Sequence, residues 1–193
     1  MFGWQVFAPK SIVLSGMSIV LRPPRRRDYQ EWSALRRRNQ NILRAREPQW
    51  PPDALTRRYY RRYVREYRLA ARYALGYGFL VFRADSSQLM GAVHLTQIRR
   101  GAAQMGTLGY WLGEEFQGHG YMREAVALVC DFAFTALGLH RLEAACMLDN
   151  AASQTVLTVN AFAHEGRAKN YLQINGHWVD HELFGLGSED WAS

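Results

Sequence analysis

The residues from Gln117 to Met122, which read QGHGYM, are the clearest candidate for ligand chemistry in this sequence. Gly118 and Gly120 leave the backbone open to close approach, because glycine has no Cβ. An apolar stretch with the pattern of a helix follows, and the first N–H groups of a helix are unpaired and lie at the positive end of its dipole. Such a loop suits a pyrophosphate. The chain has no GxxxxGK[ST] and no third glycine for GxGxxG, which excludes two common nucleotide loops.

Two further segments carry groups that can move protons. Asn150 and Ser153 stand at the predicted start of a helix. The Ser153 hydroxyl can protonate a leaving group, and the alternative is that it satisfies N–H groups at the helix start. Glu47, which precedes a proline-rich loop, is a candidate for binding a positively charged group or for accepting a proton from it. The alternative for Glu47 is an ion pair with one of the many nearby arginines.

Histidines and cysteines give weaker signals. His177 and His181 lie close in sequence to Asp180 and Glu182, but the HExxH order is missing and the segment alternates like a strand, so we predict no metal site. Cys130 and Cys146 lie in apolar stretches, which is typical of buried thiols. Two cysteines without a CxxC fit a reducing, cytoplasmic location.

Secondary-structure patterns indicate alternating helices and strands. We predict strands over residues 18–23, 78–83, 89–99, 107–113, 141–147, 162–174 and 178–186, and helices over residues 25–39, 53–74, 121–137 and 150–160. Asp53 is the expected cap of the second helix, and an Asn175-Gly176 turn joins the last two strands. The residues Leu55, Tyr59, Tyr63 and Tyr67 are spaced four apart, which favours a packing face, and the alternative is a platform on which bases stack. The alternation predicts a mixed α/β (α+β) fold with helices on a central sheet.

Composition is that of an ordinary globular protein. The 193 residues are 48% hydrophobic and 21% charged, which favours a single soluble domain. No apolar run approaches the ~20 residues of a membrane span. The N-terminal stretch is interrupted by Pro9 and Lys10 and does not read as a signal peptide.

The charge is distributed unevenly along the chain. Residues 1–72 contain sixteen Arg and one Lys against five acidic residues, whereas residues 73–193 carry a net charge of −5. The Arg-rich residues 22–72 therefore predict contact with a phosphate-rich or acidic partner, such as RNA or the ribosome. The alternative is a genome that encodes Arg in place of Lys, since the chain has twenty-two Arg and two Lys.

Three stretches resemble the GNAT acetyltransferases, and the resemblance spans residues 17–186. They read GYWLGEEFQGHGYMREA, HRLEAACMLDNAAS and EGRAKNYLQINGHWVDHELF. The opening Met1-Phe2-Gly3, the pair Glu47-Pro48 and the motif KNYL-x-INGHW-x-DH are similar to the RimJ branch of the RimJ/RimL family, which acetylates N-termini of ribosomal proteins. The resemblance implies a GNAT fold with a central, mostly antiparallel, twisted sheet of about six to seven strands flanked by helices. Residues 1–16 would be an extension and residues 187–193 a tail.

The resemblance also implies acetyl-CoA as co-substrate, without a metal. Its pyrophosphate would be held by Gln117, Gly118, His119, Gly120, Tyr121 and Met122. The backbone of Tyr110, Trp111 and Leu112 would bind the pantetheine and polarise the thioester. Asn150 and Ser153 match the family's Asn-x-x-Ser, so Ser153, Asn150 and Glu47 are the predicted catalytic residues. Two family features are missing: Leu157 replaces a frequent acid Tyr, and Leu172 replaces the Glu of RimL-like enzymes.

The missing base favours an α-amine as acceptor. An α-amine has a pKa of about 7.7–8.0 and is partly neutral at pH 7, whereas a lysine amine, with a pKa of about 10.4, is almost entirely charged. We therefore expect N-acetylation of a protein N-terminus. The alternatives are acetylation of a small amine or antibiotic, and a ribosome- or RNA-binding assembly factor without catalysis. The intact glycine loop and Ser153 argue against the second, and a basic acceptor side would disfavour polycationic amines.

Overall fold

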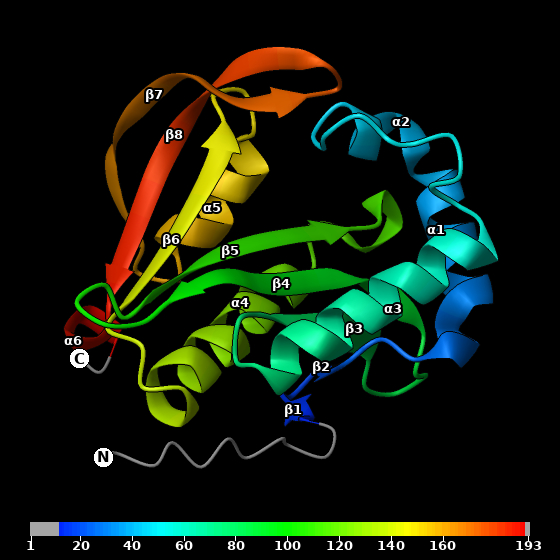
Figure 1. Ribbon diagram of the computed structural model, residues 1–193, viewed down its shortest axis with the longest axis horizontal. Coiled ribbons are helices and arrows are strands. Elements are labelled where there is room, and N and C mark those ends of the chain that lie inside the picture. The colour runs from blue at the N-terminus through cyan, green and yellow to red at the C-terminus, as the bar shows by residue number, and fades with distance from the viewer. Residues whose placement is uncertain (1–11, 192–193) are drawn as a thin grey trace.

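The computed structural model describes residues 12–191, which form one eight-stranded sheet with helices on both faces (Figure 1). The strand order is β1-β2-β3-β4-β5-β6-β8-β7, and every neighbouring pair is antiparallel except β5 and β6, which are parallel. The strands are β1 (Leu14–Ser15), β2 (Ile19–Arg22), β3 (Tyr77–Arg83), β4 (Leu89–Arg99), β5 (Met105–Leu112), β6 (Arg141–Met147), β7 (Ala163–Ile174) and β8 (His177–Gly187).

The described residues form six helices, two more than the four predicted, because α2 and α6 were not predicted. They are α1 (Tyr29–Arg38), α2 (Gln40–Arg44), α3 (Arg57–Arg72), α4 (Tyr121–Asp131), α5 (Ala151–Thr158) and α6 (Ser188–Trp191). Short 3-10 turns precede α1 and follow β5, and α4 continues as a π-helical turn over Phe132–Ala136. The predicted mixed α+β fold is confirmed.

The strand count is eight and exceeds the predicted six to seven. The additional strand, β1, has two residues, which is too short for an alternating pattern to be recognised. It lies within the predicted extension over residues 1–16, and α6 lies within the predicted tail. The Met1-Phe2-Gly3 motif lies outside the described residues.

Helix α3 begins later than the sequence suggests. Its cap is Thr56, whose hydroxyl accepts a hydrogen bond from the Tyr59 N–H at 3.2 Å. The predicted cap, Asp53, lies in the preceding turn, where its carbonyl accepts from the Thr56 N–H at 2.9 Å. The prediction of Asp53 is therefore wrong, because the Pro51-Pro52 segment adds a turn before the helix can start.

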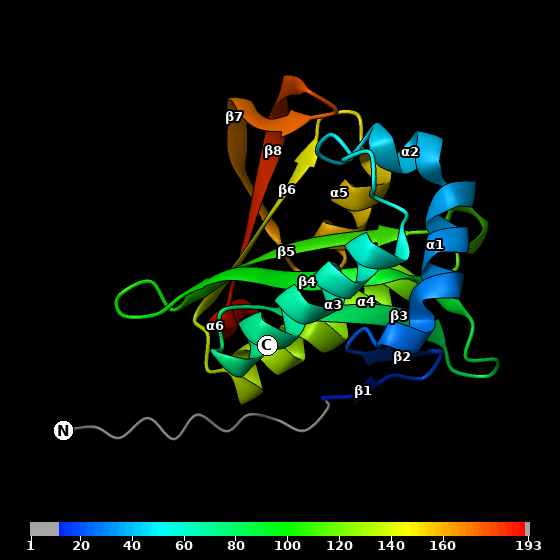
Figure 2. The same ribbon diagram turned by 45° about the vertical axis from the view of Figure 1, so that its right-hand side comes forward.

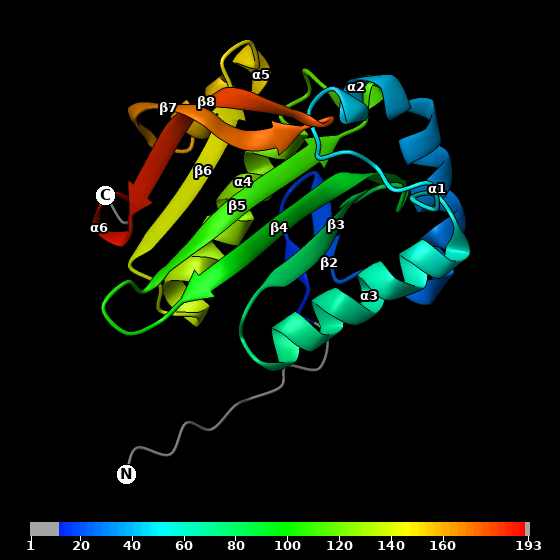
Figure 3. The same ribbon diagram turned by 45° about the horizontal axis from the view of Figure 1, so that its top comes forward.

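Helices cover the two faces of the sheet at different places. α4 buries Met122, Ala125, Val126 and Val129, whose spacing of three and four residues forms one apolar stripe, against one face. Figure 3 shows α3 across the opposite face, where the Trp32 and Tyr60 rings pack with centroids 4.8 Å apart. Figure 2 shows α1 and α2 standing at one end of the strands, near the tip of the β7–β8 hairpin.

Candidate active site

The central feature of the site is a separation between β5 and β6. Their parallel pairing runs from Met105 with Arg141 to Leu108 with Ala144 and then stops. Beyond that point the two strands diverge, as Figure 1 shows. Among the described residues, the β6-facing edge of β5 therefore has no strand partner from Gly109 onward, and its one hydrogen bond there is a long one, from the Gln117 side chain to the Leu112 carbonyl at 3.5 Å. A cavity of about 660 Å³ lies at the divergence and is lined by residues of β4, β5, β6, α1, α3, α5 and the β7–β8 hairpin.

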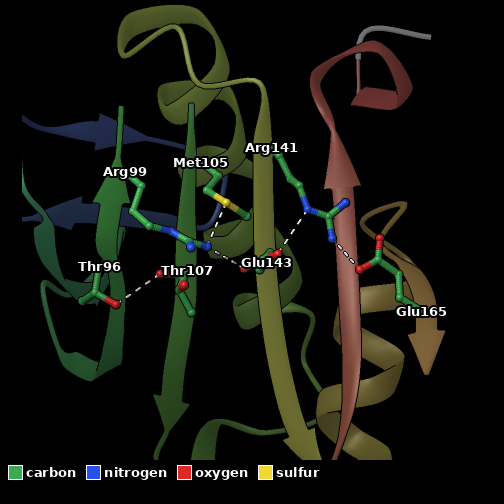
Figure 4. Close-up of polar contacts among 7 residues, drawn as sticks. All are labelled: Thr96, Arg99, Met105, Thr107, Arg141, Glu143 and Glu165. Carbon is green, nitrogen blue, oxygen red and sulfur yellow. Dashed lines mark hydrogen bonds and ion pairs between the residues drawn. The ribbon is translucent and has the colours of Figure 1, made fainter. Parts of the chain in front are cut away.

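An ion-pair network joins the strands at the closed end of this divergence. Glu143 on β6 accepts from Arg141 at 3.3 Å and pairs with Arg99 of β4 at 3.5 Å. Arg141 reaches across β8 to Glu165 on β7, and this hydrogen bond is the main cause of the raised pKa of Arg141. Figure 4 shows the contacts crossing the strands. They connect β4, β6 and β7 at the end of the sheet where β5 and β6 are still paired.

The glycine loop has the conformation expected of an anion site. Gly118 and Gly120 have φ values of 78° and 80°, in the left-handed region that glycine tolerates. A Cβ built on either residue meets no atom within 4 Å, so the space above the loop is open. Gly120 is the N-cap of α4, which places unpaired N–H groups of Tyr121 and Met122 at that space. The loop thus fits a phosphate group approaching the backbone.

Ser153 contacts a residue whose side chain the sequence did not suggest. The Tyr110 hydroxyl lies 2.9 Å from the Ser153 Oγ and donates to the Ser153 carbonyl at 3.2 Å. Asn150, rather than Ser153, caps α5, since its Oδ1 accepts from the Ser153 N–H at 3.2 Å. Burial raises the pKa of Tyr110, while the Ser153 bond lowers it. The phenol therefore stays protonated, and the two hydroxyls form a neutral, proton-donating pair.

The opposite side of the cavity is walled by aromatic rings around one ion pair. Glu47 accepts from Arg36 at 3.0 and 2.5 Å and from the Trp50 indole N–H at 2.7 Å. The Arg36 guanidinium lies over the rings of Trp50 and Trp111, at 4.4 and 5.2 Å. Glu47 is thus an ion-paired residue of the loop, the alternative considered above, and it also lines the cavity.

Charge in the cavity differs from what the sequence suggested. The charged side chains that line it are Arg36, Arg46, Glu47 and Glu66. Helix α3 contributes Tyr59, Tyr63 and Tyr67 to the wall, whereas its arginines face another surface. The expectation of a basic acceptor side is therefore wrong for the cavity itself, and charge does not exclude cationic amines.

One imidazole in the wall is held neutral. His94 of β4 is paired opposite Gly109 and bonds the Tyr63 hydroxyl through Nε2 at 2.8 Å. Its ring stacks on Tyr67 with centroids 4.8 Å apart. Burial, aided by the Arg36 charge, lowers the pKa of His94 to about 4. At neutral pH this group is an uncharged and weak base.

A second imidazole, His181 of β8, is also buried at the cavity, with 3% of its surface exposed. Its Nδ1 lies 2.9 Å from the Val179 carbonyl. A carbonyl only accepts hydrogen bonds, so Nδ1 carries the proton and Nε2 of the neutral ring is an acceptor. His181 pairs with Met147, whose sulfur accepts from Arg46, so it lies on the same side of the sheet as the Glu47 loop.

The β7–β8 hairpin closes this side of the cavity. Asn175 and Gly176 both have positive φ, 45° and 86°, as the predicted two-residue turn requires. The Asn175 N–H donates to the Glu47 carbonyl at 2.9 Å, which ties the hairpin tip to the loop after α2. Leu172, where RimL-like enzymes carry Glu, also lines the cavity. Two of the three features that indicated the RimJ branch, the Glu47-Pro48 pair and the hairpin motif, are therefore in contact.

Other sequence predictions have clear places in the structure. Cys130 and Cys146 are free and buried, and burial raises the pKa of both thiols. Leu157, where many GNAT enzymes place a Tyr, is fully buried in the core. Among residues 12–191, no three His, Cys, Asp or Glu side chains gather as a metal site would need. No helix in the same range is long and apolar enough to cross a bilayer.

Comparison with known proteins agrees with this geometry. The sequence model of the Acetyltransferase (GNAT) domain matches residues 18–162. The chain belongs to the GNAT acetyltransferase family. It is 36% identical to a Bacillus subtilis protein named probable N-acetyltransferase YjcK, over 92% of this chain and 98% of that protein. It is 34% identical to the Escherichia coli [Ribosomal protein uS5]-alanine N-acetyltransferase, over 59% of each chain.

Two solved structures extend the comparison. The ribosomal-protein-S5-alanine acetyltransferase of Vibrio fischeri superposes with a TM-score of 0.86 at 30% identity, covering 93% of this chain and 98% of that one. Mycobacterium smegmatis RimJ in complex with CoA-disulfide superposes with a TM-score of 0.85 at 30% identity, covering 95% and 88%. This GNAT enzyme is thus similar to RimJ-type acetyltransferases over nearly its whole length.

Proposed function

We propose that this GNAT enzyme transfers the acetyl group of acetyl-CoA to the α-amine of a protein N-terminus, with a ribosomal protein as the favoured acceptor. One observation carries the proposal. The Tyr110–Ser153 hydroxyl pair and the His181–Glu47 side occupy opposite faces of the sheet, and the cavity between the separated strands joins them. Acid and base are thereby available to the two partners of a transfer reaction.

The residues fit acetyl-CoA on the α4–α5 side. The open loop from Gln117 to Met122 would hold the pyrophosphate on backbone N–H groups. The unpaired β5 edge over Tyr110–Leu112 would bond the pantetheine arm and polarise the thioester carbonyl. When bound there, acetyl-CoA supplies the thioester that an amine can attack.

Ser153 is the proposed proton donor. The amine nitrogen forms a bond to the acetyl carbon while the carbon–sulfur bond breaks, and the departing sulfur takes a proton from the Ser153 hydroxyl. Tyr110, 2.9 Å away, can return a proton to Ser153 and must then regain one from water in the cavity, since burial raises its pKa and disfavours the phenolate. Asn150 fixes the start of α5 and so the position of Ser153. This assigns Asn150 a positioning role.

His181 is the proposed acceptor of the amine proton. Its Nε2 is an unengaged acceptor on the acceptor side of the sheet, whereas the Nε2 of His94 is already bonded to Tyr63. Glu47, which accepts three hydrogen bonds, would bind the ammonium form rather than deprotonate it. An α-amine is partly neutral at pH 7, so a histidine base suffices for it.

Two sets of observations support a protein N-terminus as acceptor. The relatives whose names state an acceptor include the uS5-alanine enzyme of Escherichia coli, and the Vibrio fischeri structure is named for S5 alanine. In this chain the hairpin motif and the Glu47 loop meet over the cavity, joined by the Asn175 hydrogen bond. The proposal includes a cytoplasmic location, where ribosomal proteins are made.

Mass spectrometry of acetylated peptides tests the proposal. A peptide with a free N-terminal Ala should gain one acetyl group at its α-amine. The same peptide with a blocked N-terminus and an internal Lys should react far more slowly, and the α-amine rate should rise between about pH 7 and 8 as the amine loses its proton. Acetyl found mainly on lysine, or on small amines alone, would contradict the assignment.

A further inference from the structure

A second concave surface lies on the other side of α3, away from the active-site cavity. It is a groove of about 1260 Å³ between α3 and the connection from β2 to α1. We call it the arginine groove, and its arginines are Arg25, Arg26, Arg57, Arg58, Arg61, Arg62, Arg65, Arg68 and Arg72. None of the described residues that line it is Asp or Glu.

The lack of carboxylates separates this groove from the rest of the surface. Outside the groove, eight of the thirteen arginines have ion pairs in the described structure. For example, Arg22 bonds Asp28 at 2.7 Å, and Arg167 bonds Glu182 at 2.8 Å. Within the groove Arg62 alone has ion pairs in the described structure, with carboxylates at 3.7 and 3.9 Å. A genome that favours Arg would enrich arginine everywhere, but it would not remove the acidic partners from one surface.

The groove arginines of α3 also form a line. Arg58, Arg61, Arg65, Arg68 and Arg72 are spaced alternately three and four residues apart, so they share one stripe, and all five are exposed. At 1.5 Å per residue the stripe is about 21 Å long. The floor of the groove is apolar, with Pro23, Pro24 and Phe79 among its residues.

We propose that the arginine groove binds a nucleic-acid backbone, and in particular RNA. A line of single positive charges along one helix can follow the phosphates of a nucleic-acid strand, and the guanidinium fork bonds phosphate oxygens in pairs. An extended acidic peptide fits less well, because its successive side chains point to opposite sides. The choice of RNA rests on the proposed function, since a ribosomal acceptor lies beside ribosomal RNA.

Binding of a labelled single-stranded RNA to the full chain, without acetyl-CoA, tests this inference. The variant Arg65→Glu/Arg68→Glu reverses two charges of the stripe and so removes two phosphate contacts. The matched control, Arg27→Glu/Arg37→Glu, changes net charge equally at two exposed arginines outside the groove. Loss of two phosphate contacts should weaken binding at least ~20-fold near 0.1 M salt. The slope of log K against log salt is negative, and it should become less steep by about 1.4. The control should retain the wild-type slope.

Three outcomes would overturn the inference. They are no measurable RNA binding, equal weakening by both variants, and polyglutamate competing as well as RNA at equal charge, which would assign the groove to an acidic protein. Arg65→Gln/Arg68→Gln repeats the test if the Glu variant unfolds. Acetylation of a free peptide does not need the groove, so it should be equal in all these variants. Failure of the groove and failure of the acetyltransferase assignment are therefore distinguishable.

Discussion

The contact between Tyr110 and Ser153 yields the sharpest prediction for catalysis. Ser153→Ala removes the proposed proton donor. The backbone N–H at position 153 still donates to the Asn150 Oδ1, so the α5 cap remains. Removing a general acid typically costs 10²–10⁴-fold in rate, and we expect kcat to fall about 10²-fold or more. Acetyl-CoA affinity should remain nearly unchanged.

Tyr110→Phe separates catalysis from stability. It removes the 2.9 Å contact to the Ser153 Oγ and the 3.2 Å bond to its carbonyl. As a structural loss this is about 1–3 kcal/mol of unfolding free energy, at roughly 1 kcal/mol for each hydrogen bond. If Tyr110 returns the proton to Ser153, kcat should also fall, and the double variant should be no slower than Ser153→Ala alone, because residues that act as a unit are not additive.

Single-turnover rates with a reactive N-terminal peptide, and urea unfolding, are measured for four proteins: wild type, Ser153→Ala, Tyr110→Phe and the double variant. Together they form a double-mutant cycle. Thr155→Ala is the matched control, since it removes another α5 hydroxyl, one that bonds the Ala151 carbonyl and is exposed. Independent, multiplicative losses in the double variant would refute a shared proton path. A loss of stability with unchanged kcat in Ser153→Ala would refute the donor role itself.

Three other predictions follow from the site. Gly120→Val should weaken acetyl-CoA binding measured by calorimetry on the folded variant, because a branched side chain fills the open space above the loop and disfavours φ of 80°; unchanged affinity would contradict the loop assignment. His181→Ala should lower kcat about 10²-fold near pH 7 and less near pH 9, where the α-amine is already neutral; a loss that does not vary with pH would indicate a structural role. His94, whose folded pKa of about 4 lies below its unfolded 6.5, contributes stability that is complete above pH 6.5 and is lost as pH falls toward 4. Wild type should therefore lose about 2 kcal/mol more unfolding free energy than His94→Gln between pH 7 and 5, and parallel losses in urea titrations would contradict the lowered pKa.

Local sequence signals determined much of the fold. The alternating patterns located every strand except the two-residue β1. The Asn175-Gly176 turn could be predicted from the sequence, because only a few residue types tolerate positive φ at both positions. The glycine loop could be predicted for the same reason, since Gly118 and Gly120 adopt left-handed conformations before a helix. Signals of this kind depend on a few neighbouring residues, and the sequence contains them in full.

The chemistry of the site depended on contacts between distant segments. Tyr110 and Ser153 are 43 positions apart, and nothing near either residue indicates that their hydroxyls meet. The partner of Glu47 could have been any nearby arginine, and packing among tryptophans selected Arg36.

Helix geometry decided where the positive charge of the first seventy-two residues lies. The tyrosines of α3 face the cavity, whereas its arginines line the separate groove. The sequence determined that this segment is basic, but a net charge does not tell which surface of the folded protein carries the arginines. Only the rotation of α3 about its axis, fixed by burial of Tyr60 against Trp32, assigned its arginines to one surface and left the charged residues of the cavity balanced, with two Arg and two Glu.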